Sequence, residues 1–214
     1  MFPDTHQLLI FLVATLALNF TPGPDMLYVT ARSLGEGRRA GIVSSLGIAA
    51  GCLVHMLAVA LGVSQALRQA PLLYDAIRYA GAAYLVYLGI RSLIAPVDAD
   101  ALPGRPLPAA SSSSWRIFRQ GAVTNILNPK VALFFLAFLP QFVDSARGSV
   151  MLQLLLLGLA FNTSGTLVNI AVALGVSRVR GWLTTSRRPL ALLQRVPGVV
   201  FIGLGLRLAF DEPR

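Results

Sequence analysis

The sequence predicts an all-α membrane protein of six transmembrane helices, arranged as two inverted-topology three-helix repeats. Three observations support this fold class: a deficit of charge, a series of long apolar stretches and an internal duplication. Of the 214 residues, 55% are hydrophobic and only 13% are charged. Soluble domains carry roughly 25% charged residues, so this chain has too few polar side chains to cover a soluble surface.

Six apolar stretches are long enough to cross a bilayer core, which requires about 20 residues in an α-helix. They lie near 6–31, 40–64, 71–94, 117–143, 149–176 and 191–210. The first has no basic region and no small-residue cleavage site before it, so we expect a retained helix rather than a signal peptide. The polar segment 95–116 is rich in proline and serine, which predicts a linker between a first repeat at 1–94 and a second at 117–214.

The basic residues indicate how the helices are oriented. The segments that follow the first, third and fifth stretches carry 12 arginines, among them Arg32, and the opposite side carries five. Because basic residues concentrate in cytoplasmic loops, this pattern predicts a multi-pass protein of the bacterial inner membrane with both termini in the periplasm. The net charge of +9 then reflects topology, and we expect no nucleic-acid partner because the arginines form no continuous stripe.

The internal duplication relates the two halves of the chain. Ala58–Ser64 and Ala171–Ser177 both read AVALGVS, and Pro24 and Pro129 interrupt the first and fourth stretches at corresponding places. Each half contains three stretches, so the second half must enter the membrane with the opposite polarity. Inverted repeats are a recurrent plan of secondary transporters, which bind their substrate at mid-membrane beside interrupted helices.

The first interruption reads Thr21-Pro22-Gly23-Pro24-Asp25. Two prolines remove two backbone donors, so a continuous helix cannot persist there, and such a break is tolerated only where it faces protein or water. Gly23 allows another chain or a ligand to approach closely. Burying the Asp25 carboxylate in a membrane costs about 2.5–3.5 kcal/mol, so we expect it to line a cavity or be paired. It could carry a proton, contact a substrate ammonium or form a static ion pair.

The second interruption places Lys130, the only lysine of the chain, directly after Asn128-Pro129. A cation at the start of a helix is disfavoured by the helix dipole, so we expect a carboxylate to offset it, from Asp25 or from a ligand. Asn125 and Asn128 supply amide donors and acceptors beside this break. Of the polar residues in the fifth stretch, Asn162 is the one that we expect to face the cavity.

Other notable residues have ordinary structural explanations. Gly47 and Gly51 form a GxxxG motif, which predicts close helix packing and leaves open a homodimer contact. His55 is expected to be a hydrogen-bonded packing residue, and Cys52, the only cysteine, cannot form an intramolecular disulfide. The chain has no metal-ligand cluster, nucleotide-binding glycine pattern or serine–histidine pairing, so we expect no metal, no cofactor and no enzymatic activity.

Across essentially its whole length the sequence resembles the LysE/RhtB family of bacterial amino-acid exporters. The resemblance rests on Thr21–Val29, on Gly41 together with the two GxxxG glycines, and on Asn128–Phe142. It implies export of amino acids or their derivatives, such as threonine, homoserine, homoserine lactone or basic amino acids, driven by the proton gradient. The implied partners are a small amino-acid substrate, protons and the lipid bilayer.

These arguments select ten residues for substrate binding or coupling: Thr21, Pro22, Gly23, Pro24, Asp25, Asn125, Asn128, Pro129, Lys130 and Asn162. The alternative function is a membrane scaffold or assembly protein in which Asp25 and Lys130 form a structural intramembrane ion pair. An exporter predicts a polar cavity between the two breaks, whereas a scaffold requires only that the two charges hold the helices together.

Overall fold

The computed structural model describes residues 5–69 and 113–183, together with isolated helical positions between 79 and 94 and between 199 and 206. Helices dominate the described residues and no strand occurs among them, which confirms the predicted all-α class. The predicted stretches at 71–94 and 191–210 and most of the predicted linker at 95–116 lie outside the continuously described segments. The proposed division into two repeats therefore stays a prediction.

The first predicted stretch is divided into two helices, as the prolines predict. Helix α1 spans Thr5–Phe20 and helix α2 spans Pro24–Glu36, and their axes are bent by 47°. Proline at the first position of α2 costs no hydrogen bond, because the first N–H groups of a helix have no partner within it. Gly23 precedes it in an extended conformation, with φ −164°.

The fourth predicted stretch is divided in the same way. Helix α5 spans Ser114–Ile126 and helix α6 spans Pro129–Leu133. The axis bends by 49° between α5 and the segment Pro129–Phe142, which begins with α6. Beyond α6 the chain continues as a π-helical turn, Phe134–Phe138, and a 3₁₀ turn, Leu139–Phe142. The predicted breaks in the first and fourth stretches are thus confirmed.

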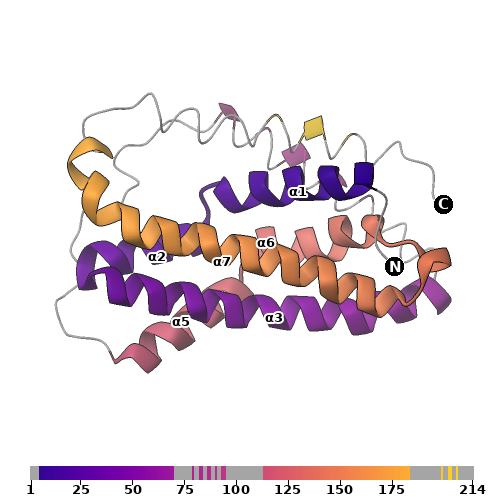
Figure 1. The fold of residues 1–214 in the computed structure, drawn as a ribbon, viewed down its shortest axis with the longest axis horizontal. Helices are drawn as coiled ribbons and strands as arrows, with labels where there is room; N and C mark the ends of the chain where they lie inside the picture. Colours follow the sequence, from indigo (N-terminus) through magenta and orange to yellow (C-terminus); the bar gives the residue numbers. More distant parts are fainter. Residues whose placement is uncertain are drawn as a thin grey trace.

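Two long unbroken helices form the middle of the described structure. Helix α3 spans Arg38–Gln69 and helix α7 spans Val150–Leu183, and they pack along each other with α5 against α3 (Figure 1). Parts of both, residues 38–62 and 150–176, are long and apolar enough to cross a membrane, and each bent pair could form one further span.

The connection between α2 and α3 is shorter than the sequence predicted. Only Gly37 separates the two helices, with φ +87°, a left-handed conformation that glycine adopts without steric cost. Arg32 was expected in a loop, and this expectation was wrong. Its side chain lies buried within α2 and bonds to Glu36 on the same helix and to Gln120 on α5.

The GxxxG motif of α3 packs against α5 of the same chain. A Cβ atom on Gly47 would lie 2.2 Å from the carbonyl oxygen of Phe118, and one on Gly51 would lie 2.4 Å from that of Ala122. On the facing helix, a Cβ on Gly121 would lie 2.7 Å from the carbonyl oxygen of Ser44. The expected close packing is confirmed, and because α5 covers these glycines they are not available for a dimer contact.

Candidate substrate site

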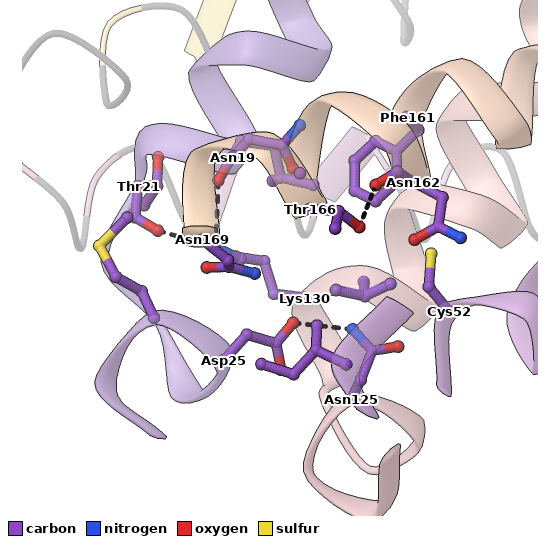
Figure 2. A pocket seen from close by; sticks show the side chains of 15 residues that line it. Asn19, Thr21, Asp25, Cys52, Asn125, Lys130, Phe161, Asn162, Thr166 and Asn169 are labelled. Carbon is purple, nitrogen blue, oxygen red and sulfur yellow. Dashed lines mark hydrogen bonds between the residues drawn. The ribbon is translucent and has the colours of Figure 1, made fainter. Parts of the chain in front are cut away.

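A cavity lies where the two helix breaks meet (Figure 2). Its wall comes from the end of α1 and start of α2, the end of α5 and start of α6, and the middle of α3 and α7. Five of the ten predicted residues line it: Thr21, Asp25, Asn125, Lys130 and Asn162. The chain thus brings residues more than 100 positions apart to one place beside the breaks.

Asp25 lies in the first turn of α2, where the positive end of the helix dipole favours an anion. Its Oδ2 accepts a hydrogen bond of 2.7 Å from Nδ2 of Asn125 (Figure 2). Its Oδ1 is buried without a partner at hydrogen-bond distance, and so is Nδ2 of Asn128, whose side chain lies close to this carboxyl. A buried carboxylate oxygen is costly to leave unpaired, so a shift of Asn128 or a further donor would stabilise Asp25.

Lys130 reaches back across the cavity to the end of α1. Its Nζ donates to the backbone oxygens of Leu18, at 3.1 Å, and Thr21, at 2.9 Å. In a continuous helix the oxygen of Leu18 would accept from the N–H of residue 22, which is a proline. The break therefore provides carbonyl acceptors for this ammonium at the negative end of α1, where a cation is favoured.

Lys130 was expected to be offset by a carboxylate. Asp25 does interact with it through space, while the direct hydrogen bonds of its ammonium go to the backbone oxygens of Leu18 and Thr21. Among the described residues, Asp25 and Lys130 form no direct ion pair. Each charge instead contacts the other break, since Asp25 bonds to Asn125 at the end of α5 and Lys130 bonds to the end of α1.

The remaining five predicted residues shape the breaks and do not line the cavity. Oδ1 of Asn128 caps α6 by accepting from the backbone N–H of Lys130 at 3.1 Å. A Cβ on Gly23 would lie 3.0 Å from Nζ of Lys130, so the missing side chain leaves room for the lysine. Pro22, Pro24 and Pro129 interrupt the helices.

Three further polar residues line the cavity that the sequence argument did not select: Asn19, Thr166 and Asn169. A signal for the α7 residues existed, because Asn162, Thr166 and Asn169 are spaced i, i+4 and i+7 and so lie on one helix face. Asn162 donates from Nδ2 to the backbone oxygen of Ala49 at 3.2 Å, which ties this face to α3.

Asn19 lies at the end of α1 and donates from Nδ2 to Oγ of Ser164 at 3.0 Å. A Cβ on Gly165 would lie 2.9 Å from Oδ1 of Asn19, so this glycine lets the asparagine reach α7. His55 places Nε2 3.0 Å from the backbone oxygen of Asn125 and stacks on Phe135, which confirms it as a hydrogen-bonded packing residue.

The rest of the wall is apolar. Leu18, Met26, Ile48, Val131 and Phe161 line the cavity together with the polar groups. Its volume is about 40 Å³, enough for only a few water molecules. An amino acid is several times larger than a water molecule, so binding one requires side chains or helices to move.

Comparison with known proteins agrees with the resemblance seen in the motifs. Residues 16–212 match the family described as LysE type translocator. The chain is similar to the uncharacterised membrane protein YrhP of Bacillus subtilis (28% identical over 207 residues, 94% of this chain and 98% of the relative). It is also similar to the leucine efflux protein of Salmonella typhimurium (26% over 199 residues, 93% of this chain and 92% of the relative).

A third relative is the uncharacterised membrane protein PA4757 of Pseudomonas aeruginosa, 33% identical over 190 residues, with 88% of each chain covered. No solved structure matches the chain. Since the family match extends over nearly the whole sequence and agrees with the two broken helices, this membrane protein belongs to the LysE type translocator family.

Proposed function

We propose that this protein exports amino acids across the bacterial inner membrane and binds them in the cavity between the two helix breaks. Membership of a translocator family and similarity to a leucine efflux protein support export. The observation that carries the proposal is the pairing of one acid and one base in a single polar cavity, Asp25 and Lys130. An amino acid carries the complementary charges, an ammonium and a carboxylate.

The lining favours a neutral amino acid with an aliphatic side chain. Ile48, Val131 and Phe161 offer apolar surface beside the two charges, and among the described lining residues Asp25 is the one carboxylate. A basic amino acid would bring a second cation, which this carboxylate would have to share. Leucine is therefore the first substrate to test, ahead of threonine, homoserine, homoserine lactone and the basic amino acids that the family resemblance implies.

Export is secondary active in this proposal and coupled to protons, with Asp25 as the proton carrier. The reciprocal contacts of Asp25 and Lys130 support an inverted repeat whose pseudo-twofold axis passes between the breaks. Both termini lie in the periplasm, as the arginine distribution favours.

The test is efflux from proteoliposomes preloaded with radiolabelled leucine, with and without an imposed pH gradient. Wild-type protein is expected to release leucine faster when the gradient is present. Asp25→Asn keeps the size of the side chain and can still bond to Asn125, so it removes only the titrating charge and is expected to lose the acceleration. Full proton-driven efflux by this variant would refute the coupling role of Asp25.

The scaffold alternative predicts a different result in the same preparation. If the charges only hold helices together, Asp25→Asn lowers the thermal stability of the purified protein, and leucine does not raise the stability of the wild type. Stabilisation of the wild type by leucine, together with gradient-driven release, would exclude the scaffold.

A further inference from the structure

We propose that the ammonium of Lys130 occupies the site of the substrate's own ammonium in the empty cavity, and that a bound amino acid displaces it. This inference rests on the proposed function. In it, the substrate's ammonium takes over the carbonyl oxygens of Leu18 and Thr21, and Lys130 swings to the substrate's carboxylate. The lysine is then a specificity-determining residue that selects ligands carrying both charges.

Lys130 and a free amino acid carry the same cationic group. Nζ of Lys130 is a primary ammonium with three donors, the same group that an amino acid carries on its α-carbon. It is held by two backbone oxygens at 3.1 and 2.9 Å, at the end of α1 where a helix favours a cation. A site that binds one primary ammonium at normal hydrogen-bond distances can bind another.

The Asp25 carboxylate lies where it can attract a second cation. Asp25 lines the same cavity, and its Oδ1 is buried without a hydrogen-bond partner. Lys130 has not taken this acceptor, although a lysine side chain is long and flexible. The Asp25 carboxylate therefore lines the cavity with an acceptor that Lys130 does not occupy, and it would attract a second cation that enters.

The Lys130 side chain takes up volume that a bound amino acid would need. The cavity of about 40 Å³ holds only a few water molecules while Lys130 spans it. Displacement of the lysine would free volume between the breaks at the place where the new ammonium is needed. A carboxylate on the incoming molecule supplies the partner that compensates Lys130 for the two carbonyls that it leaves.

The consequence is a rule for ligands. A simple alkylamine could take the carbonyls but would leave Lys130 unpaired in the membrane, so the wild type excludes it. A simple carboxylate could pair with Lys130 but would leave the two carbonyls without a cation. Only a molecule with both groups satisfies both partners.

The experiment compares leucine with two truncated analogues, 3-methylbutylamine, which lacks the carboxylate, and 4-methylpentanoate, which lacks the ammonium. Binding is measured by thermal stabilisation of purified wild-type protein and of the Lys130→Met variant. The wild type is expected to bind leucine and neither analogue. Lys130→Met is expected to bind 3-methylbutylamine at least about tenfold more tightly than the wild type does, because one charge-assisted hydrogen bond contributes roughly that factor.

Lys130→Arg is the matched control, since it keeps a cation at this position and should continue to exclude the amine. Equal affinity of wild type and Lys130→Met for 3-methylbutylamine would overturn the proposal. So would undiminished binding of leucine by Lys130→Met.

Lys130→Met could also be unstable, because it removes the ammonium from the Leu18 and Thr21 carbonyls, of which only the Leu18 oxygen keeps a backbone donor, the N–H of Thr21 at 3.1 Å. That instability provides a second test. Adding 3-methylbutylamine during purification is expected to restore the thermal stability of the variant, since it returns an ammonium to the same oxygens. If the amine gives no recovery while a stable variant at an unrelated site behaves normally, the carbonyls are not an ammonium site.

A third measurement uses the unaltered protein. Lys130 is the only lysine, so protein labelled with ¹³C,¹⁵N-lysine gives a single lysine signal by NMR. Leucine is expected to shift its side-chain resonances as Nζ moves from carbonyls to a carboxylate, whereas the amine is not. If leucine binds and the lysine signal does not change, displacement is wrong while amino-acid export stands. If the wild type neither binds nor exports any amino acid, the proposed function itself fails.

Discussion

Asn125 connects several parts of the cavity through one buried side chain. Its Nδ2 donates to Asp25, and its backbone oxygen is 3.0 Å from Nε2 of His55 on α3. The residue lies in the last turn of α5, directly before the second break. A single amide thus orients the carboxylate that follows the first break.

Replacing Asn125 tests whether its amide orients the Asp25 carboxylate. Asn125→Leu removes the 2.7 Å hydrogen bond that Asn125 donates to the Asp25 carboxylate, and we expect a loss of about 1–3 kcal/mol in the free energy of unfolding. Leucine binding should weaken at the same time because the carboxylate loses its fixed orientation. Thermal unfolding and ligand stabilisation measure the two effects. Thr124→Val is the control, since the half-buried Thr124 side chain bonds within α5 to the oxygen of Gln120. An equal loss in both variants would contradict this role.

Gly23 offers a milder perturbation of the same site. Its extended φ of −164° is open to any residue, so Gly23→Ala strains no backbone. The added Cβ would lie 3.0 Å from Nζ of Lys130 and should push the lysine from the Thr21 oxygen. We expect a folded protein whose lysine NMR signal is shifted without ligand. Gly62→Ala on α3 is the control, because no atom lies within 4 Å of its added Cβ and the lysine signal should not shift. An unshifted signal in Gly23→Ala would show that the lysine does not approach Gly23.

Residue chemistry allowed the two charges to be predicted, but their partners could not be. An acid and a lone lysine inside apolar stretches indicate a polar cavity because hydrocarbon does not tolerate them unpaired. The partners of Lys130 are backbone oxygens 109 and 112 residues away in the chain. Every residue has a backbone oxygen, so residue types alone do not indicate which ones bind the lysine. Only the folded arrangement of α1 against α6 reveals them.

At the scale of elements, the closest packing lies between α3 and α5. The Cβ of Gly47→Ala would lie 2.2 Å from the backbone oxygen of Phe118, which cannot move without shifting α5. We expect the variant to lose about 1–3 kcal/mol of stability, the usual cost of overpacking. On the same helix, Gly62→Ala meets no atom within 4 Å and should gain about 0.5–1 kcal/mol from helix propensity. Reversible unfolding in detergent compares the pair, and equal stabilities would contradict this packing.

Helix breaks were predictable because their cause is local. A proline lacks an N–H wherever it stands, so the interruptions at Pro24 and Pro129 follow from sequence alone. The continuation of α2 through Arg32 to Glu36 was not predicted, because an arginine near a span end usually indicates a loop. Here the bonds of Arg32 to Glu36 and to Gln120 on α5 allow it to be buried in a helix.

The π-helical and 3₁₀ turns after α6 also escaped prediction. Phe134, Phe138 and Phe142 belong to a cluster of aromatic rings with Phe11 of α1 and Phe161 of α7. The wider and then tighter winding brings these rings together, and such an adjustment depends on neighbours that are distant in sequence.

At the scale of the whole molecule, the predicted orientation can be tested with two matched serines. Ser114, at the start of α5, and Ser145, in the turn before α7, are both exposed. The arginine distribution places the first in the cytoplasm and the second in the periplasm. A membrane-impermeant thiol reagent applied to intact cells should label Ser145→Cys and not Ser114→Cys, against a background in which Cys52 is buried. The reverse pattern would invert the topology.

The polar face of α7 was only partly predictable. Composition and periodicity predict spans, and the repeat predicts that equivalent breaks meet. Asn162 was predicted to face the cavity, but its helix neighbours Thr166 and Asn169, which line the same wall, were not selected although their spacing puts them on the same face. The orientation of this face is set by packing against α3, to which Asn162 is tied through the oxygen of Ala49.

The glycine contact between α3 and α5 bears on how such a molecule could change shape. These helices come from opposite halves of the sequence, yet their backbones touch with no side chain between them. Pulling the halves apart would open this seam to lipid and forfeit its dispersion energy. We therefore expect α3 and α5 to stay together as one unit in any change of shape, and any hinge motion to lie at the two helix breaks beside them. A disulfide joining α3 to α5 should leave efflux intact.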